Sequence, residues 1–351
     1  MSGARPRPGL RDVEPYEAPQ LEVKARLNTN ECPYPLPPAF GEELARAVRD
    51  LGLNRYPDRE AEELRARLAA LNGHTLEGTW VANGSNEILQ QLLLAYGGPG
   101  RRVALFEPTY AMHARLAWVT QSDVIRVELE EPWKIELRDL LTAFEARPDI
   151  VFVCSPNNPT GNAQDVRPAI DVATQRSALV VVDEAYVEFG GDSAASILHA
   201  FPNLNLVVVR TFSKAFALAG ARLGYCLAAP EVIEDLRRVR LPYHLSSLTQ
   251  AAGLVALDHR AEALEIIAAV HAERDRLADA LPTLGVEAFP SDANFVLFRP
   301  PRPARDVWQG LLDREVLVRD CSDRVPGCLR VTAGTPEEVD LFLSALEEVL
   351  R

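Results

Sequence analysis

The feature that most constrains this chain is a series of short, uninterrupted apolar runs. VFVC, LVVVD and LVVVR occupy residues 151–154, 179–183 and 206–210, and segments with helical periodicity separate them. Runs that are continuous rather than alternating are typical of parallel strands buried on both faces. We therefore predict an α/β fold, with a mostly parallel central sheet flanked by helices in a large domain and a smaller α+β domain.

The length of 351 residues is consistent with about two domains. We expect an extended arm at 1–40, a large domain at 41–245 and a small C-terminal domain at 246–351. Four prolines at 33, 35, 37 and 38 argue against a regular helix in the arm.

The C-terminal segment has its own helical signals. A long helical stretch is expected from about 246 to 280. The last helix should begin at Thr335, because TPEE places Pro336 at the first helical position and Glu338 where it completes a capping box.

Composition excludes several classes of protein. A net charge of −13 and a pI near 5.1 disfavour binding to nucleic acid or to an acidic membrane surface. No apolar run approaches the ~18 residues of a membrane span, and the N-terminal residues lack the apolar core of a secretory signal. The five cysteines form no CxxC pair, so we expect a cytoplasmic protein with reduced thiols and no metal site.

Polar residues follow each predicted strand, at the edge where open parallel sheets bind ligands. Gly84, Ser85 and Asn86 open a helix after TWVAN, and the free N–H groups of a helix N-terminus bind phosphate, although an ordinary N-capped turn has the same pattern. SPNNPTG after VFVC is also compatible with a simple turn. Asp183 ends a buried run and needs a partner there, in a salt bridge, a cap or a functional site.

The segment RTFSKAFALAGARLGY adds a lysine to this edge. Lys214 lies in an apolar stretch, Thr211 and Ser213 precede it, and Arg222 follows. A lysine, a buried carboxylate and a phosphate cradle at three strand ends together fit a pyridoxal 5'-phosphate pocket. The lysine amine would form a Schiff base with the aldehyde, the carboxylate would keep the pyridine nitrogen protonated, and an aromatic ring such as Tyr110 would stack on the cofactor.

These motifs carry a resemblance to a known family. SPNNPTG, VVVDEAY and RTFSKAFALAGARLGY, in this order, resemble the fold-type I pyridoxal-phosphate-dependent aminotransferases. The chain is also similar, from about residue 13 to the end, to the histidinol-phosphate aminotransferases. This similarity is carried by the segments LNTNE, RYPD, ANGSNE, FEPTY, SDANFVLFR, VLVRD and LRVTAGTPEE. The resemblance implies amino transfer between L-histidinol phosphate and 2-oxoglutarate, giving imidazole-acetol phosphate and L-glutamate, in histidine biosynthesis.

The same resemblance implies roles for individual residues. The catalytic residues would be Lys214, Asp183 and Tyr186. The cofactor would be held by these three and by Gly84, Ser85, Asn86, Tyr110, Asn158, Thr211, Ser213 and Arg222. Substrate would be bound by Tyr16, Asn30, Tyr56 and Arg330. Tyr56 would also reach the cofactor phosphate of a neighbouring subunit, which implies a homodimer.

Two segments depart from the family pattern. NEC at 30–32 replaces the more usual NEN, and His244 and Ser246 stand where asparagines are common; both segments are expected near the substrate. The alternatives are an aromatic or broad-range aminotransferase, a phosphothreonine-type decarboxylase and a non-catalytic ligand-binding protein on the same scaffold. A dinucleotide-binding enzyme is disfavoured because no GxGxxG follows a first strand.

Overall fold

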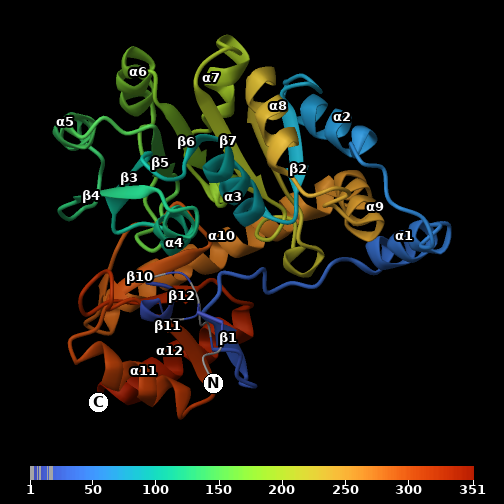
Figure 1. Cartoon of the computed structure of the whole chain (residues 1–351). Helices are drawn as coiled ribbons and strands as arrows, with labels where there is room; N and C mark the ends of the chain where they lie inside the picture. Colours follow the sequence, from blue (N-terminus) through green and yellow to red (C-terminus); the bar gives the residue numbers. More distant parts are fainter. Residues whose placement is uncertain (1–3, 6, 8, 14, 16–18) are drawn as a thin grey trace.

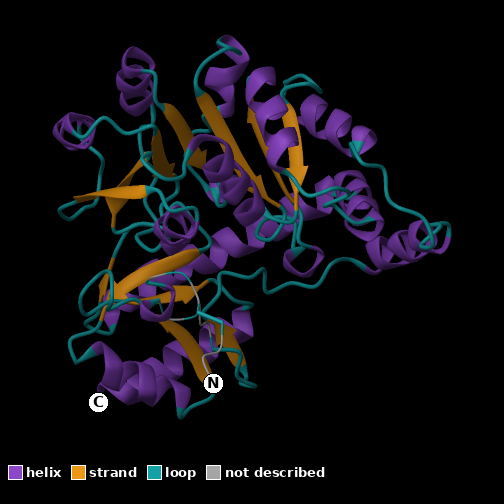
Figure 2. Ribbon diagram, in the orientation of Figure 1, coloured by secondary structure: helices purple, strands orange, loops and turns teal. Residues whose placement is uncertain are grey.

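A computed structural model describes residues 4–5, 7, 9–13, 15 and 19–351 (Figure 1). It contains a seven-stranded sheet with helices on both faces, and a five-stranded sheet built mainly from the C-terminal segment (Figure 2). The α/β fold with a mostly parallel central sheet is therefore confirmed. Among the described residues, none of the helices has the length and apolar character needed to cross a membrane.

The seven-stranded sheet contains the three valine-rich runs at its centre. β3 through β7 pair in parallel, whereas β8 runs antiparallel to both of its neighbours. The strand order is β2 (Thr79–Ala82), β8 (Gly224–Ala228), β7 (Leu206–Thr211), β6 (Leu179–Asp183), β5 (Ile150–Cys154), β3 (Arg102–Glu107) and β4 (Asp123–Glu128).

Successive side chains of these strands enter two different apolar layers. Val181 and Val207 face one layer, and Val180, Val182 and Val208 face the other. Burial on both faces explains why the runs do not alternate with polar residues. The first layer is covered by α3 (Ser85–Tyr96), α4 (Ala111–Val119) and α8 (Pro230–Val239), and the second by α5 (Leu137–Glu145), α6 (Arg167–Arg176), α7 (Ala195–Ala200) and α2 (Glu62–Leu71).

The five-stranded sheet joins the two ends of the chain. Its order is β1 (Ala25–Leu27), β11 (Val316–Asp320), β12 (Leu329–Thr332), β10 (Phe295–Arg299) and β9 (Glu287–Ala288). β1 pairs in parallel with β11, and the other pairs are antiparallel. Helices α11 (Ala304–Leu312) and α12 (Pro336–Leu350) pack beside it, and α10 (Arg260–Thr283) runs between the two sheets (Figure 1).

The N-terminal segment is more ordered than an extended arm. It contains the short 3-10 helix Leu10–Asp12 and strand β1, and α1 (Pro38–Arg49) begins inside it. Proline is tolerated at the start of a helix because the first N–H groups have no partner within the helix. The expected helix over 246–280 is two helices, since α9 (Ser247–Asp258) ends before α10 begins and packs against α1 and α2. The division into three parts stays a prediction.

The expected capping box at the last helix is confirmed. The Thr335 side chain accepts a hydrogen bond from the N–H of Glu338, and the Glu338 carboxylate accepts one from the N–H of Thr335. Two N–H groups that the helix itself leaves unpaired are therefore satisfied.

A buried ion pair connects the central strands beneath the edge where β6 and β7 end. The Arg210 guanidinium donates to Glu184 Oε2 at 3.0 Å and also contacts Ser193 and Asn72. The Glu184 side chain is only 1% exposed. Glu188 lies in the same region, and burial raises the pKa of its carboxyl to about 7. Arg210 therefore compensates negative charge that has no access to water.

Replacing Arg210 by methionine should lower the free energy of unfolding by roughly 3–5 kcal/mol, because Glu184 would stay buried without its cation. Urea unfolding measures the effect. The matched control is Arg314→Met, which removes an exposed pair with Glu348 and should cost at most about 1 kcal/mol. Equal losses in the two variants would contradict this account of the buried pair.

Candidate active site

A cavity of about 360 Å³ lies at the carboxyl ends of the central strands and is closed by the five-stranded sheet. Cys154, Asp183 and Thr211, at the ends of β5, β6 and β7, form part of its wall, and Arg330 of β12 forms another part. The chain places these groups together because parallel strands end at one edge.

Asp183 is held at the bottom of this cavity by a histidine. Its side chain is about 2% exposed, and its Oδ2 lies 3.1 Å from Nε2 of His113. The His113 ring is fully buried and stacks on Phe152 at 4.7 Å, while the N–H of Ala185 donates to Oδ1 of Asp183. Polar partners of this kind are what a buried carboxylate requires.

Lys214 follows β7 and points its amine into the same cavity. Its Nζ donates to the carbonyl oxygen of Thr29 at 3.0 Å and lies 5.9 Å from the centre of the Tyr186 ring. Burial, aided by the positive charges of Arg330 and Arg222, lowers the pKa of Lys214 to about 7. A substantial fraction of the amine is therefore neutral near pH 7, the form that acts as a base or nucleophile.

Groups that can bind an anion lie beside the lysine. Helix α3 begins at Ser85 with no side-chain cap, so the N–H groups of its first turn stay available. The hydroxyls of Thr211 and Ser213 lie 2.9 Å apart, and Arg222 Nη1 donates to Ser213. A side chain at Gly84 would collide with Arg222, because a Cβ there would lie 2.6 Å from Nη2.

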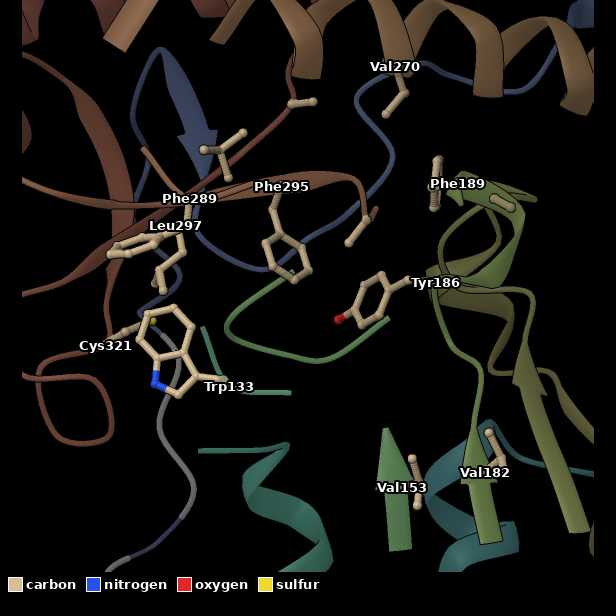
Figure 3. Packing of buried hydrophobic residues seen from close by; sticks show 14 of the residues in the cluster. Trp133, Val153, Val182, Tyr186, Phe189, Val270, Phe289, Phe295, Leu297 and Cys321 are labelled. Atoms are coloured by element: carbon tan, nitrogen blue, oxygen red, sulfur yellow. The ribbon is translucent and has the colours of Figure 1, made fainter. Parts of the chain in front are cut away.

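A network of hydrogen bonds around Tyr186 forms another wall of the cavity. The Tyr186 hydroxyl accepts from Nδ2 of Asn30 at 3.0 Å and from Nδ2 of Asn158 at 3.2 Å, and burial raises its pKa to about 12. Arg330 donates to Oδ1 of Asn158 and to the carbonyl oxygen of Asn28. The Tyr186 ring meets Phe295 edge-on at 5.3 Å, as Figure 3 shows.

Tyr110 stands where α4 begins, between this cavity and the helix. Its hydroxyl donates to Oδ1 of Asn86 at 3.2 Å, and its ring meets His113 edge-on. The fold thus brings most of the residues singled out in the sequence to one cavity, whose lining includes Asn30, Ser85, Asn86, Tyr110, Asn158, Asp183, Tyr186, Thr211, Ser213, Lys214, Arg222 and Arg330.

Gly84 adjoins the lining residue Ser85, and three other residues singled out in the sequence do not line this cavity. Tyr16 falls outside the described residues. Tyr56 is 79% exposed and stacks on Tyr243, away from the cavity of its own chain. His244 stacks on Trp80 and bonds to the backbone of β2, and Ser246 caps α9. His244 and Ser246 are therefore structural within this chain, and the expectation that they lie near the substrate is wrong for its own cavity.

Sequence reasoning missed several members of the site. His113 gives no signal, because a single histidine in AMHARLAW fits any helix and its partner lies 70 residues away. The carbonyl groups of Asn28 and Thr29 carry no side-chain signature. The end of β11 and the segment after it also line the cavity, and only the family resemblance carried by VLVRD (316–320) could have indicated them: Arg319, Asp320, Cys321, Asp323 and Arg324.

Comparisons with known proteins agree with this geometry. The family model for aminotransferase class I and II matches residues 22–346. Histidinol-phosphate aminotransferases of Thermobifida fusca and Streptomyces avermitilis are 49% and 50% identical to the chain, covering 97% and 98% of it and 94% and 96% of those proteins. The crystal structure of histidinol-phosphate aminotransferase from Sinorhizobium meliloti with pyridoxal-5'-phosphate has a TM-score of 0.89 at 25% identity, over 100% of this chain and 98% of that one.

The fold and the lysine–aspartate cavity define a pyridoxal-phosphate-dependent transferase. The chain belongs to the aminotransferase class I and II family, and its curated relatives are histidinol-phosphate aminotransferases.

The residues present fit pyridoxal phosphate. The cavity offers a partly neutral lysine amine, a buried carboxylate and, beside Arg222, a glycine whose positive φ favours residues without a side chain. In addition, His113 Nδ1 and Arg330 Nε are buried without a partner among the described residues. The chemistry of this donor set matches the aldehyde, ring nitrogen and phosphate of the cofactor.

Substitution of Gly84 by alanine should weaken cofactor binding by roughly 5- to 150-fold, because its backbone conformation (φ 78°, ψ 167°) costs about 1–3 kcal/mol for other residues. Cofactor titration followed by absorbance measures this. The matched control is Gly220→Ala, at a glycine that lines the cavity but where a new Cβ meets nothing within 4 Å. If both variants bind the cofactor like the wild type, Gly84 does not belong to the site that holds the cofactor phosphate.

The pKa of Lys214 predicts how fast cofactor-free protein takes up pyridoxal phosphate. Only the neutral amine adds to an aldehyde, so the rate should rise as the pH passes through about 7 and then level off. An unperturbed lysine would keep accelerating toward its ordinary pKa of about 10.4. Stopped-flow absorbance from pH 6 to 9.5 checks this, and a rate still climbing at pH 9.5 would contradict the lowered pKa.

Proposed function

We propose that the protein transfers an amino group between L-histidinol phosphate and 2-oxoglutarate, giving imidazole-acetol phosphate and L-glutamate, as a step of histidine biosynthesis. The observation that carries the proposal is the cavity that joins Lys214, Asp183 and Arg330. Relatives at 49–50% identity over nearly the full chain, all named histidinol-phosphate aminotransferases, support the substrate.

Each part of the cofactor has residues that would hold it. When bound, pyridoxal phosphate carries the amino group and delocalises the electrons left when a carbon–hydrogen bond breaks. Asp183, fixed by His113, would hold the protonated ring nitrogen. Asn158 and Tyr186 would bond to the ring hydroxyl, and Tyr110 would stack on the ring. The phosphate would lie among Gly84, Ser85, Asn86, Thr211, Ser213 and Arg222.

Lys214 would move the proton. Its Nζ would accept the proton from the amino-bearing carbon of the substrate and hold it for return later in the reaction. This requires a neutral amine at the working pH, which the lowered pKa of about 7 supplies. The carbonyl oxygen of Thr29, 3.0 Å away, orients the amine.

Arg330 would bind the anionic end of each substrate. Its guanidinium is largely buried, stacks over Phe295 at 5.0 Å and is oriented by Asn158 and Asn28. A guanidinium fixed in this way can bond to a phosphate or a carboxylate with two parallel hydrogen bonds. The phosphate of histidinol phosphate and a carboxylate of glutamate would therefore use the same position in turn, with Asn30 and Tyr16 beside them.

Incubation of the purified protein with histidinol phosphate and 2-oxoglutarate should form glutamate, and Arg330→Met should lower kcat/KM about a hundredfold, as expected when a buried charged contact is lost. The cofactor absorption of this variant should be unchanged. If aromatic amino acids are better donors than histidinol phosphate, or if the products are carbon dioxide and an amine, the substrate assignment fails while the cofactor assignment stands.

We also propose that the protein is a cytoplasmic homodimer. A group of exposed apolar residues lies on neighbouring loops and on α9: Leu53, Tyr56, Leu241, Tyr243 and Leu248. An exposed cluster of this kind is typical of a subunit interface, and Tyr56 would reach from it to the cofactor phosphate of the partner subunit.

Mixing two defective subunits tests this arrangement. Tyr56→Ala and Lys214→Ala homodimers should both have low activity. Heterodimers of the two should regain one working site, because wild-type Lys214 and wild-type Tyr56 then meet across the interface. The measurement is activity after co-expression with separate affinity tags. Heterodimers no more active than the parent variants would show that Tyr56 acts within its own subunit or not at all.

A further inference from the structure

Two cysteines face each other where the last hairpin leaves the five-stranded sheet. β11 and β12 pair antiparallel, with Arg319 opposite Arg330 and Asp320 opposite Leu329. The next pair in this register is Cys321 and Cys328, and the N–H of Cys321 donates to the carbonyl oxygen of Cys328 at 3.1 Å. Both strands end one residue before the cysteines, and the N–H of Cys328 donates to the carbonyl oxygen of Val325, so one hydrogen bond joins the two cysteine backbones.

This pairing satisfies the geometric requirement for a disulfide. Directly opposite residues of an antiparallel pair project to the same face of the sheet. Directly opposite residues have Cα atoms about 4.5–5.5 Å apart, which is within the range of about 4.4–6.8 Å that disulfides join. Both thiols are free in the structure.

The two thiols differ in their access to small molecules. Cys321 belongs to the lining of the active-site cavity, next to Arg319 and Arg330 along the same face. Figure 3 labels it, with Trp133, among the residues of the large apolar cluster. Cys328 is fully buried. A reagent that enters the cavity therefore meets Cys321 first, and Cys328 lies behind it.

The loop between the cysteines is part of the cavity wall. Residues 322–327 connect them, and Asp323 and Arg324 line the cavity. Arg324 donates to the carbonyl oxygen of Thr109 at 3.1 Å, immediately before Tyr110. A covalent bond at the base of this loop would change how it is held against the site.

We propose that Cys321 and Cys328 form a reversible disulfide, a thiol modification site that opens onto the substrate cavity. The oxidant is a low-molecular-weight disulfide. The Cys321 thiolate attacks one of its sulfur atoms and displaces one small thiolate. The Cys328 thiolate then attacks Sγ of Cys321 and displaces the second small thiolate. Two protein thiols and one small disulfide become one protein disulfide and two small thiols.

Burial determines the conditions for this exchange. It raises the pKa of the Cys321 thiol, and it raises the pKa of Cys328 to about 11. Since the thiolate is the attacking form, the exchange is slow at neutral pH and accelerates as the pH rises. Substrate in the cavity should slow it further by covering Cys321.

The disulfide should affect substrate more than cofactor. Arg319 and Arg330 are each two residues from a cysteine and line the same cavity, whereas Asp183 ends a strand of the other sheet and Lys214 lies in the turn after β7. Oxidised holoenzyme should therefore show a severalfold higher KM for an anionic substrate with its cofactor absorption unchanged. This readout rests on the proposed function, but formation of the disulfide does not.

The test uses holoenzyme treated with 2-hydroxyethyl disulfide at pH 8.5, then quenched in acid, alkylated and digested with trypsin. Cleavage after Arg319, Arg324 and Arg330 places the two cysteines on different peptides, 320–324 and 325–330. The expected product is these two peptides joined by a disulfide and released by reductant. Added substrate should reduce its yield.

Three variants complete the experiment. Cys328→Ser should retain a mixed disulfide at Cys321, and Cys321→Ser should leave Cys328 unmodified. Cys226→Ser removes a thiol buried in the central sheet and should form the linked peptides like the wild type. A wild-type protein that keeps a stable mixed disulfide at Cys321 would overturn the proposal. So would two free thiols in the native protein under conditions that modify the denatured chain.

Discussion

The parallel pairing of β6 with β7 is the constraint on which the site depends. The pairing extends from Val180 opposite Leu206 to Asp183 opposite Val209. Asp183, at the end of β6, and the turn after β7 that contains Lys214 therefore lie at the same edge of the sheet. Valine on both faces buries the two strands in the core between two apolar layers. The carboxylate and the amine are therefore positioned by the packing of the core.

Burial then gives these groups their chemistry. Asp183 depends on His113 from α4, and Lys214 depends on the carbonyl oxygen of Thr29 from the N-terminal segment. Arg330 comes from the C-terminal sheet, where it contributes positive charge that helps lower the pKa of Lys214 to about 7. Three parts of the chain that are distant in sequence thus produce one cavity with a reactive amine.

Local patterns in the sequence predicted much of this arrangement. The valine runs indicated the parallel sheet, and TPEE indicated the start of α12, because both signals depend on neighbouring residues. What the sequence could not predict arises from contacts between distant segments. Examples are the bond from His113 to Asp183, the antiparallel insertion of β8, and Arg65, which is buried and donates to the carbonyl oxygen of Thr79. The break between α9 and α10 was missed because the helical pattern runs on through it.

Reduction of the cofactor-loaded protein with borohydride, followed by peptide mapping, tests the central claim most directly. The chain has only three lysines, Lys24, Lys134 and Lys214, and the first two are exposed. Neither of these two lines the cavity, whereas Lys214 lies in a cavity that fits the cofactor and has a pKa lowered to about 7. The account predicts one pyridoxyl group per chain, on Lys214, with loss of the visible absorption. A label on Lys24 or Lys134, or no label on Lys214, would contradict it.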